Sequence, residues 1–248
     1  MPNKYLASLQ SGLKQQITEK NQLIGRVILY LVIIYLFSQI FQNTQSSSFQ
    51  LWYSAMTQVI TLSSSMIAFQ ITQDIQSGQI AHFLIRPIHY LGYRICEAMG
   101  ISFVRYFLLI ACYLAARFYA TGSIPDQLLL GVVFGIAGIF LYTLTSVLIG
   151  LLSFWIKEIK SIFYLNLTAT FCFGGLIVPL DFYSPFIRAL SFFTPYPWIL
   201  WWPAGWMTGL YTRLLFPFLG WCIWTVVLGA VINTVYNKCI KSFVMEGG

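Results

Sequence analysis

The stretch Leu128–Ile156 reads LLLGVVFGIAGIFLYTLTSVLIGLLSFWI and contains no charged side chain. A helix needs about 20 predominantly apolar residues to cross the roughly 30 Å hydrocarbon core of a bilayer. A transmembrane β-strand would instead show alternating polarity in pieces of about 10 residues. This run is longer than such a piece and apolar on all sides, so it predicts a membrane-spanning helix.

Five more segments along the chain have the same character. They are Leu23–Phe41, Leu51–Ile71, Ile95–Ala120, Ile162–Leu180 and Leu214–Tyr236. Of the 248 residues, 58% are hydrophobic and only 8% are charged, whereas a soluble domain carries about 25% charged residues. We therefore predict an all-α integral membrane protein with six transmembrane helices, in which residues 1–248 form a single transmembrane domain.

The positive charges indicate how the chain crosses the membrane. The net charge of +7 could also suit nucleic-acid binding, but no basic run with interleaved aromatic residues is present. Cytoplasmic loops of membrane proteins are enriched in Lys and Arg. If the N-terminus is inside, ten of these residues are cytoplasmic and three (Arg117, Arg188 and Arg213) are outside, with Arg105 inside the third helix. The distribution predicts a multi-pass protein with both termini in the cytoplasm and no nucleic-acid partner.

Two segments outside the six helices have unusual patterns. In residues 1–22, Leu6, Leu9, Leu13 and Ile17 share one helical face, which predicts an amphipathic helix at the cytoplasmic interface. An ordinary solvated lead-in to the first helix is the alternative.

The segment 181–212 is too apolar for an open loop and too rich in proline for a continuous helix. Its tryptophans are of the kind that gather at headgroup level. We expect an outer re-entrant helical hairpin between the fifth and sixth transmembrane helices. Gly174, Gly175 and Pro179 would let the fifth helix bend into it.

No constellation of catalytic residues is visible. The sequence has no GxSxG, no HExxH and no GxxxxGK[ST], so it cannot hold ATP phosphates in the P-loop manner. His82 and His89 are too few for a metal site. Acidic residues deep in the membrane, which ion-coupled transporters use, are also missing, although Glu97 could pair with Arg105 on one helix face. If the protein moves a substrate uphill, we expect the energy to come from a partner.

Glycines at positions 131, 135 and 138 would allow close helix packing. The partner in that contact could be another helix of this chain or a second copy, and the sequence does not choose between them.

The loop of residues 73–94 is the longest connection predicted on the cytoplasmic side. Ile75, Ile80, Phe83 and Leu84 can form one apolar face of a short helix, and Gly78 allows close approach of a partner. Such a face could dock into a groove of another protein. Alternatively, Ile80 and Leu84 could pack beneath the membrane domain of this same chain.

This loop reads Gln73-Asp74-Ile75-Gln76-Ser77-Gly78-Gln79-Ile80, followed by Phe83-Leu84-Ile85-Arg86-Pro87, and it resembles the corresponding loop of ABC type-2 export permeases. Gly175-Leu176-Ile177-Val178-Pro179-Leu180, with Phe182, Pro185 and Pro195, resembles the stretch after the fifth helix of that family. The order of the elements agrees over nearly the whole chain. One departure is Gln76, where the family often carries a basic residue.

The resemblance implies a permease subunit of an ATP-driven exporter in the bacterial plasma (inner) membrane. It implies two separate ABC ATPase subunits, which bind ATP and Mg, and a second permease, identical or related; the chain itself would hold no cofactor. The residues implied in ATPase coupling are Asp74, Ile75, Ser77, Gly78, Ile80, Leu84, Arg86 and Pro87. We expect the outer Pro- and Trp-rich segment to cap the exit of the pathway as an outer gate, with Pro179, Pro185, Pro195, Trp201 and Trp202 as its residues; a simple anchor at the membrane interface is the alternative. A self-standing secondary transporter or channel is the alternative, followed by an intramembrane enzyme.

Overall fold

The computed structural model describes residues 2–41, 47–85, 89–210 and 215–246. Within these ranges every regular element is a helix, and no strand is present. Four helices are long and apolar enough to cross a membrane: α2 (Lys20–Phe41), α6 (Tyr90–Thr121), α7 (Leu128–Leu151, extended by a 3-10 turn to Phe154) and α12 (Leu215–Glu246, apolar to Ile240). These four correspond to four of the six predicted spans.

The other two predicted spans are shorter in the structure. The segment predicted as Leu51–Ile71 divides into α3 (Ser47–Ser63) and α4 (Ile67–Gln76). The segment predicted as Ile162–Leu180 forms α8 (Lys160–Gly174), which ends where Gly175 adopts a left-handed conformation. The expectation of one uninterrupted helix over Leu51–Ile71 was therefore wrong, whereas α8 is continuous and ends at Gly174, where the glycines were expected to let the chain bend.

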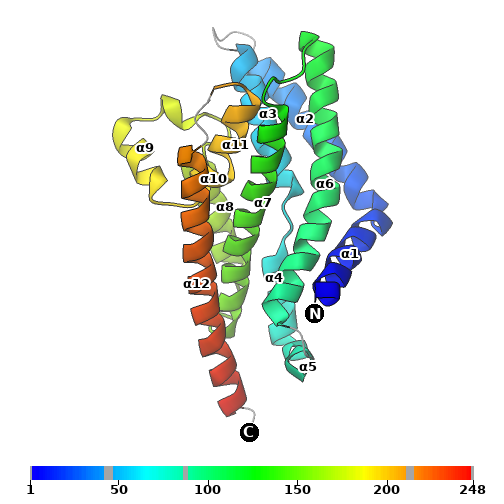
Figure 1. Ribbon diagram of the computed structural model, residues 1–248, viewed down its shortest axis with the longest axis vertical. Helices are drawn as coiled ribbons and strands as arrows, with labels where there is room; N and C mark the ends of the chain where they lie inside the picture. The colour runs from blue at the N-terminus through cyan, green and yellow to red at the C-terminus, as the bar shows by residue number, and fades with distance from the viewer. Residues whose placement is uncertain (1, 42–46, 86–88, 211–214, 247–248) are drawn as a thin grey trace.

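The elements run roughly side by side along the long axis of the molecule (Figure 1). One end carries α5 (Gln79–Ile85) and the C-terminal part of α12, and we call it the α5 end. The opposite end carries α9 (Pro185–Phe192), and we call it the α9 end. α7 lies at the centre, in contact with α3, α4, α6, α11 (Trp201–Met207) and α12.

The core between these helices is formed mainly by large aromatic and aliphatic side chains. Tyr53, Met56 and Ile60 of α3 meet Tyr106 and other buried residues of α6 and α7. In contrast, most of α2 faces outward, and Ile28, Tyr35 and Ile40 are exposed. Such apolar exposure is what lipid-facing positions of a membrane protein require.

The glycines of α7 pack within this chain. A side chain at Gly135 would collide with the hydroxyl of Tyr106 on α6, and one at Gly138 would collide with the carbonyl oxygen of Ile199 on α10 (Tyr196–Ile199). Gly131 lies against Met207 of α11. The structure thus gives the small-residue stripe intramolecular partners, one of the two outcomes that the sequence left open.

The N-terminal segment forms α1 (Pro2–Thr18), which packs along the half of α6 nearer the α5 end (Figure 1). Its buried face consists of Ser8, Gly12 and Gln16, a stripe of period four. Gly12 and Gly100 of α6 allow the two backbones to touch, because a side chain at either would strike a carbonyl of the other helix. Of the predicted apolar face, Leu6 and Ile17 are exposed whereas Leu9 and Leu13 are half-buried, so the face lies at the edge of the contact with α6.

The segment 181–212 contains a 3-10 turn (Leu180–Phe182), α9, α10 and α11 before the described range ends at residue 210. Pro185 starts α9, and Pro195 precedes α10. The prolines therefore divide the segment into short helices, as predicted. α11 turns back and packs on α7 and α3.

Candidate functional site

The α4–α5 elbow is the part of the predicted coupling loop that the structure describes best. α4 ends at Gln76, and Gly78, with φ of 71°, reverses the chain into α5. A left-handed residue at a turn of this kind is most readily glycine. Gln73, Gln76, Ser77, Gly78 and Gln79 are exposed on the elbow.

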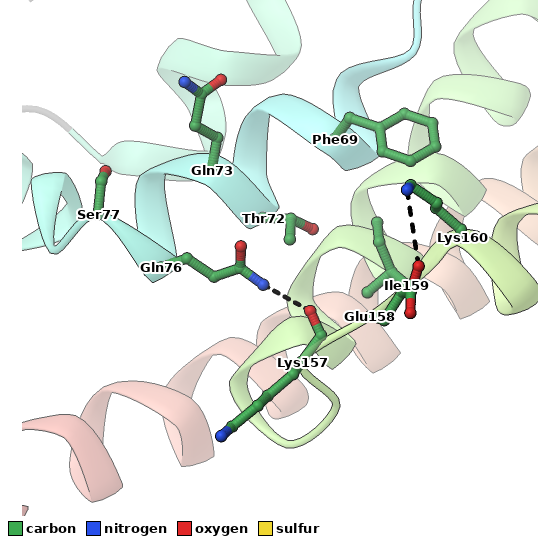
Figure 2. A pocket seen from close by; sticks show the side chains of 9 residues that line it. All are labelled: Phe69, Thr72, Gln73, Gln76, Ser77, Lys157, Glu158, Ile159 and Lys160. Atoms are coloured by element: carbon green, nitrogen blue, oxygen red, sulfur yellow. Dashed lines mark hydrogen bonds and ion pairs between the residues drawn. The ribbon is translucent and has the colours of Figure 1, made fainter.

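The two loops at this end meet in one groove of about 630 Å³, shown in Figure 2. Phe69, Thr72, Gln73, Gln76 and Ser77 line it from α4, and residues 157–160 line it from the turn before α8. The Gln76 Nε2 atom donates a hydrogen bond to the carbonyl oxygen of Lys157. Lys157, Glu158 and Lys160 are exposed at its rim, which makes the surface charged and polar.

Behind the elbow, Asp74 is held in a buried polar network. Its side chain is only 3% exposed. The guanidinium of Arg94 donates to both of its carboxylate oxygens, at 2.6 and 2.8 Å, and the Tyr90 hydroxyl donates a further bond at 2.6 Å. Paired bonds between a guanidinium and a carboxylate are among the strongest hydrogen bonds in proteins. The elbow is thereby fixed to the beginning of α6.

Arg94 also pairs with Glu97, whose carboxylate accepts a hydrogen bond at 2.6 Å. Its guanidinium lies over the ring of Phe83 from α5, 5.5 Å from the centroid. One side chain therefore links α4, α5 and α6. The expected pairing of Glu97 with Arg105 was wrong. Arg94 lies only one turn away from Glu97 and binds its carboxylate instead of Arg105.

Several residues predicted for partner docking belong instead to the interior. Ile80 is 0% exposed and is part of the hydrophobic core, so it does not project from the surface as a docking residue would. Ile75 is partly buried against the same core. Asp74 is an internal bridge rather than a contact for another protein. The side chain of Leu84, together with Arg86 and Pro87, lies outside the described residues.

At the α9 end, the backbone after α8 is irregular and is held by α3. The hydroxyls of Tyr53, Ser54 and Thr57 donate to the carbonyl oxygens of residues 175–177. Non-helical backbone at membrane depth is tolerated only where its polar groups find partners inside the protein. The hydroxyl residues Tyr53, Ser54 and Thr57 were the sequence signal for this contact. It was missed because these residues were treated as part of a uniformly apolar span.

The residues predicted for an outer gate are brought together only in part. Trp201 and Trp202 are 1% and 7% exposed, so their rings pack inside the protein rather than on a lipid-facing surface. Trp201 donates to Asp181 at 3.2 Å, and Arg188 of α9 pairs with the same carboxylate at 3.0 Å.

Pro179 is buried at the start of the 3-10 turn, whereas Pro185 is exposed. Pro195 lines a second cavity of about 400 Å³ between α7, α8 and α12. The three prolines therefore do not line one common site. Asp181 and Arg188, which the sequence reasoning did not single out, hold this end together.

Comparison with protein-family models matches residues 25–247 to the ABC-2 family transporter protein. No curated protein sequence matches the chain. The family match includes the elbow, the groove and the α9-end segment, and proteins of this family are membrane components of ABC transporters rather than the ATPase. Because the match covers most of its length, the chain belongs to the ABC-2 family of transporter membrane proteins.

Proposed function

We propose that this chain is the permease subunit of an ATP-driven exporter, with the α5 end in the cytoplasm. In this proposal it pairs with a second permease, identical or related, and receives energy from two separate ATPase subunits that bind ATP and Mg. The family match supports a role in an ABC transporter. The charge distribution supports the orientation, because most Lys and Arg residues lie toward the α5 end or in α1.

The observation that carries the proposal is the shared groove between the α4–α5 elbow and the 157–160 turn. A permease without a nucleotide site must receive force through contact with another protein. The groove is the place where both short connections at this end are exposed together, and its rim is polar and charged. Surfaces of this composition form reversible, electrostatically guided contacts.

Force applied at the elbow has a direct route into the membrane domain. Arg94 joins Asp74 to α6 through two short hydrogen bonds, and Glu97 fixes the other side of its guanidinium. A buried bidentate pair resists separation, so the elbow and the first turns of α6 should move as one body. α6 reaches the α9 end, where Arg117 donates to the carbonyl of Met207 in α11. Motion of α6 would thus reach the segment proposed to cap the exit.

The surface residues of the groove provide the test. Lys157→Glu combined with Lys160→Glu reverses two exposed charges without disturbing the core. We expect at least about a fivefold loss of co-purifying ATPase, equivalent to about 1 kcal/mol. Lys238→Glu, an exposed lysine near the end of α12, is the matched control and should retain the ATPase.

Substrate-stimulated ATP hydrolysis by the purified complex should fall in parallel with co-purification. If the double variant binds the ATPase as well as wild type and hydrolyses ATP normally, the groove is not the coupling surface.

A further inference from the structure

Two arginines meet at the break between α3 and α4, inside the membrane domain. Arg26 of α2 donates to the carbonyl oxygen of Leu62, and Arg105 of α6 donates to that of Ser64 at 3.4 Å. The two carbonyls belong to residues two positions apart, so the two guanidinium groups lie near the same short stretch of backbone.

This pair has no carboxylate bound to it. Among the described residues, the ion pairs involve Arg94, Lys160 and Arg188, and neither Arg26 nor Arg105 takes part in one. Glu19, at the junction of α1 and α2, attracts Arg105 without contacting it. The carbonyl oxygens of Leu62 and Ser64 could be satisfied by neutral hydrogen-bond donors. Hydrogen bonding to the backbone therefore does not explain why two charged side chains lie here. Charged residues within a membrane domain usually have a counter-charge or a functional ligand.

The surrounding polar groups supply further unused hydrogen-bond donors. Gln16 of α1 accepts a bond from Arg105 through Oε1, at 2.7 Å, and its Nε2 has no partner in the described structure. The hydroxyls of Ser65 and Ser102 are likewise buried without a partner in those ranges. Ser65 follows Ser64 in the chain, and Ser102 lies one turn before Arg105 on α6. The cluster has several donors and positive charge, and what it lacks is an anionic acceptor.

The cluster lies near the first turns of the candidate span α2. Arg26 is six residues from the first residue of α2, or about 9 Å at 1.5 Å per residue. α1 lies beside it with Leu6 and Ile17 exposed, as in an interfacial helix. A surface hollow of about 430 Å³, lined by residues 18–22, opens at the junction of α1 and α2. Arg105 itself is 6% exposed, whereas Arg26 is half-buried and reaches the surface.

We propose that Arg26 and Arg105 form a binding site for the phosphate of an anionic phospholipid from the leaflet at the α5 end. Guanidinium groups bind phosphate through paired, charge-assisted hydrogen bonds, and basic pockets between transmembrane helices bind anionic headgroups. Gln16, Ser65 and Ser102 would donate the remaining bonds. The bound lipid would fasten α1 and α2 to the α3–α4 break. Inorganic phosphate from the cytoplasm has the same chemistry and is the alternative source.

The test uses the full-length chain, purified in detergent and titrated with dioleoylphosphatidylglycerol, dioleoylphosphatidylcholine or inorganic phosphate. Native mass spectrometry measures bound lipid, and thermal unfolding measures stabilisation. For wild type we expect phosphatidylglycerol to bind at least tenfold more tightly than phosphatidylcholine and to raise the melting temperature. Arg26→Gln and Arg105→Gln should lose this preference, and Arg105→Lys should retain part of it. Arg117→Gln, on the same helix but bonded to Tyr113 and Met207, is the matched control.

The titrations with lipid and with inorganic phosphate can give three informative outcomes. If inorganic phosphate stabilises wild type but not the Gln variants, and phosphatidylglycerol does not, the anion site is supported with an aqueous source. If wild type shows no preference for either anion over phosphatidylcholine, the proposal is overturned, whether or not the variants fold. Equal preference in wild type, Arg26→Gln and Arg105→Gln would also overturn it. Binding of an anion at Arg26 and Arg105 is measured without the ATPase. A failure of the groove experiment would therefore leave this proposal standing, and a failure here would leave the proposed function standing.

Discussion

Arg94 is the single residue that joins most elements at the α5 end. It contacts Asp74 from α4, Phe83 from α5 and Glu97 within α6. Its role could not be read from the sequence, because Asp74 and Arg94 are separated by a turn and a second short helix. The sequence suggested that Asp74 belonged to a docking loop. In the structure, the buried guanidinium of Arg94 extends across the elbow and binds Asp74, so Asp74 is not available to another protein.

Removing one member of this pair should destabilise the protein strongly. Asp74→Leu leaves Arg94 with one carboxylate in place of two, and loss of one partner of a buried pair costs about 3–5 kcal/mol. We expect a clear fall in the melting temperature in detergent. The triple variant Asp74→Leu, Arg94→Leu, Glu97→Gln should recover part of the loss, because it leaves neither a buried guanidinium nor a buried carboxylate without a partner. If the single variant melts as wild type does, the bridge does not hold the elbow.

Two glycines test how α1 is attached. A side chain at Gly100 would collide with the carbonyl oxygen of Leu9, whereas one at Gly25 of α2 would meet nothing within 4 Å. Gly100→Leu should therefore detach α1 and expose it to protease. Gly25→Ala should be neutral or stabilising by about 0.5–1 kcal/mol, since glycine is unfavourable inside a helix. Equal protease resistance of wild type and Gly100→Leu would show that α1 is not docked on α6.

At the scale of elements, the sequence predicted the long uniform helices better than the interrupted ones. Hydropathy alone locates α2, α6, α7 and α12, because each contains enough apolar residues to cross the bilayer. It does not detect the break after Ser63, where serine hydroxyls bond to carbonyls one turn back and Arg26 and Arg105 bond to carbonyls near the break. Those arginines come from distant parts of the chain, so no local pattern reports them.

The side of α1 that packs on α6 could also not be predicted from the sequence. Leu6 and Ile17 identified the apolar side, and the structure places that side at the edge of the contact with α6. The side that packs on α6 is the stripe of Ser8, Gly12 and Gln16. Small or polar residues of this kind give little hydrophobic signal, so their spacing had not been singled out.

The two tryptophans at the start of α11 test how the α9 end is packed. Because Trp201 and Trp202 are buried, replacing each by Ala should lower stability by about 3–5 kcal/mol. Phe186 of α9 is 77% exposed, so Phe186→Ala is the matched control and should melt close to wild type. The melting temperatures of the three purified variants distinguish these cases. A tryptophan variant as stable as Phe186→Ala would contradict the packing of α11.

At the scale of the whole molecule, the proposed orientation predicts which exposed serines can be labelled from outside. Ser77 lies on the elbow, and Ser123 lies beyond the opposite end of α6. In a background without the five native cysteines, Ser123→Cys should react with a membrane-impermeant thiol reagent in intact cells. Ser77→Cys should react only after the membrane is opened. The reverse pattern would invert the topology.

The central claim is that a separate ATPase docks on the groove at the α5 end. It is tested most directly by site-specific photo-cross-linking in membranes of cells that contain the complete transporter. A benzophenone amino acid at Gln79, exposed on the elbow, should form an adduct with a polypeptide that peptide mass spectrometry identifies as carrying a phosphate-binding P-loop. The same probe at Ser123 should form none. Absence of a P-loop adduct from Gln79, or its appearance from Ser123 instead, would contradict the account.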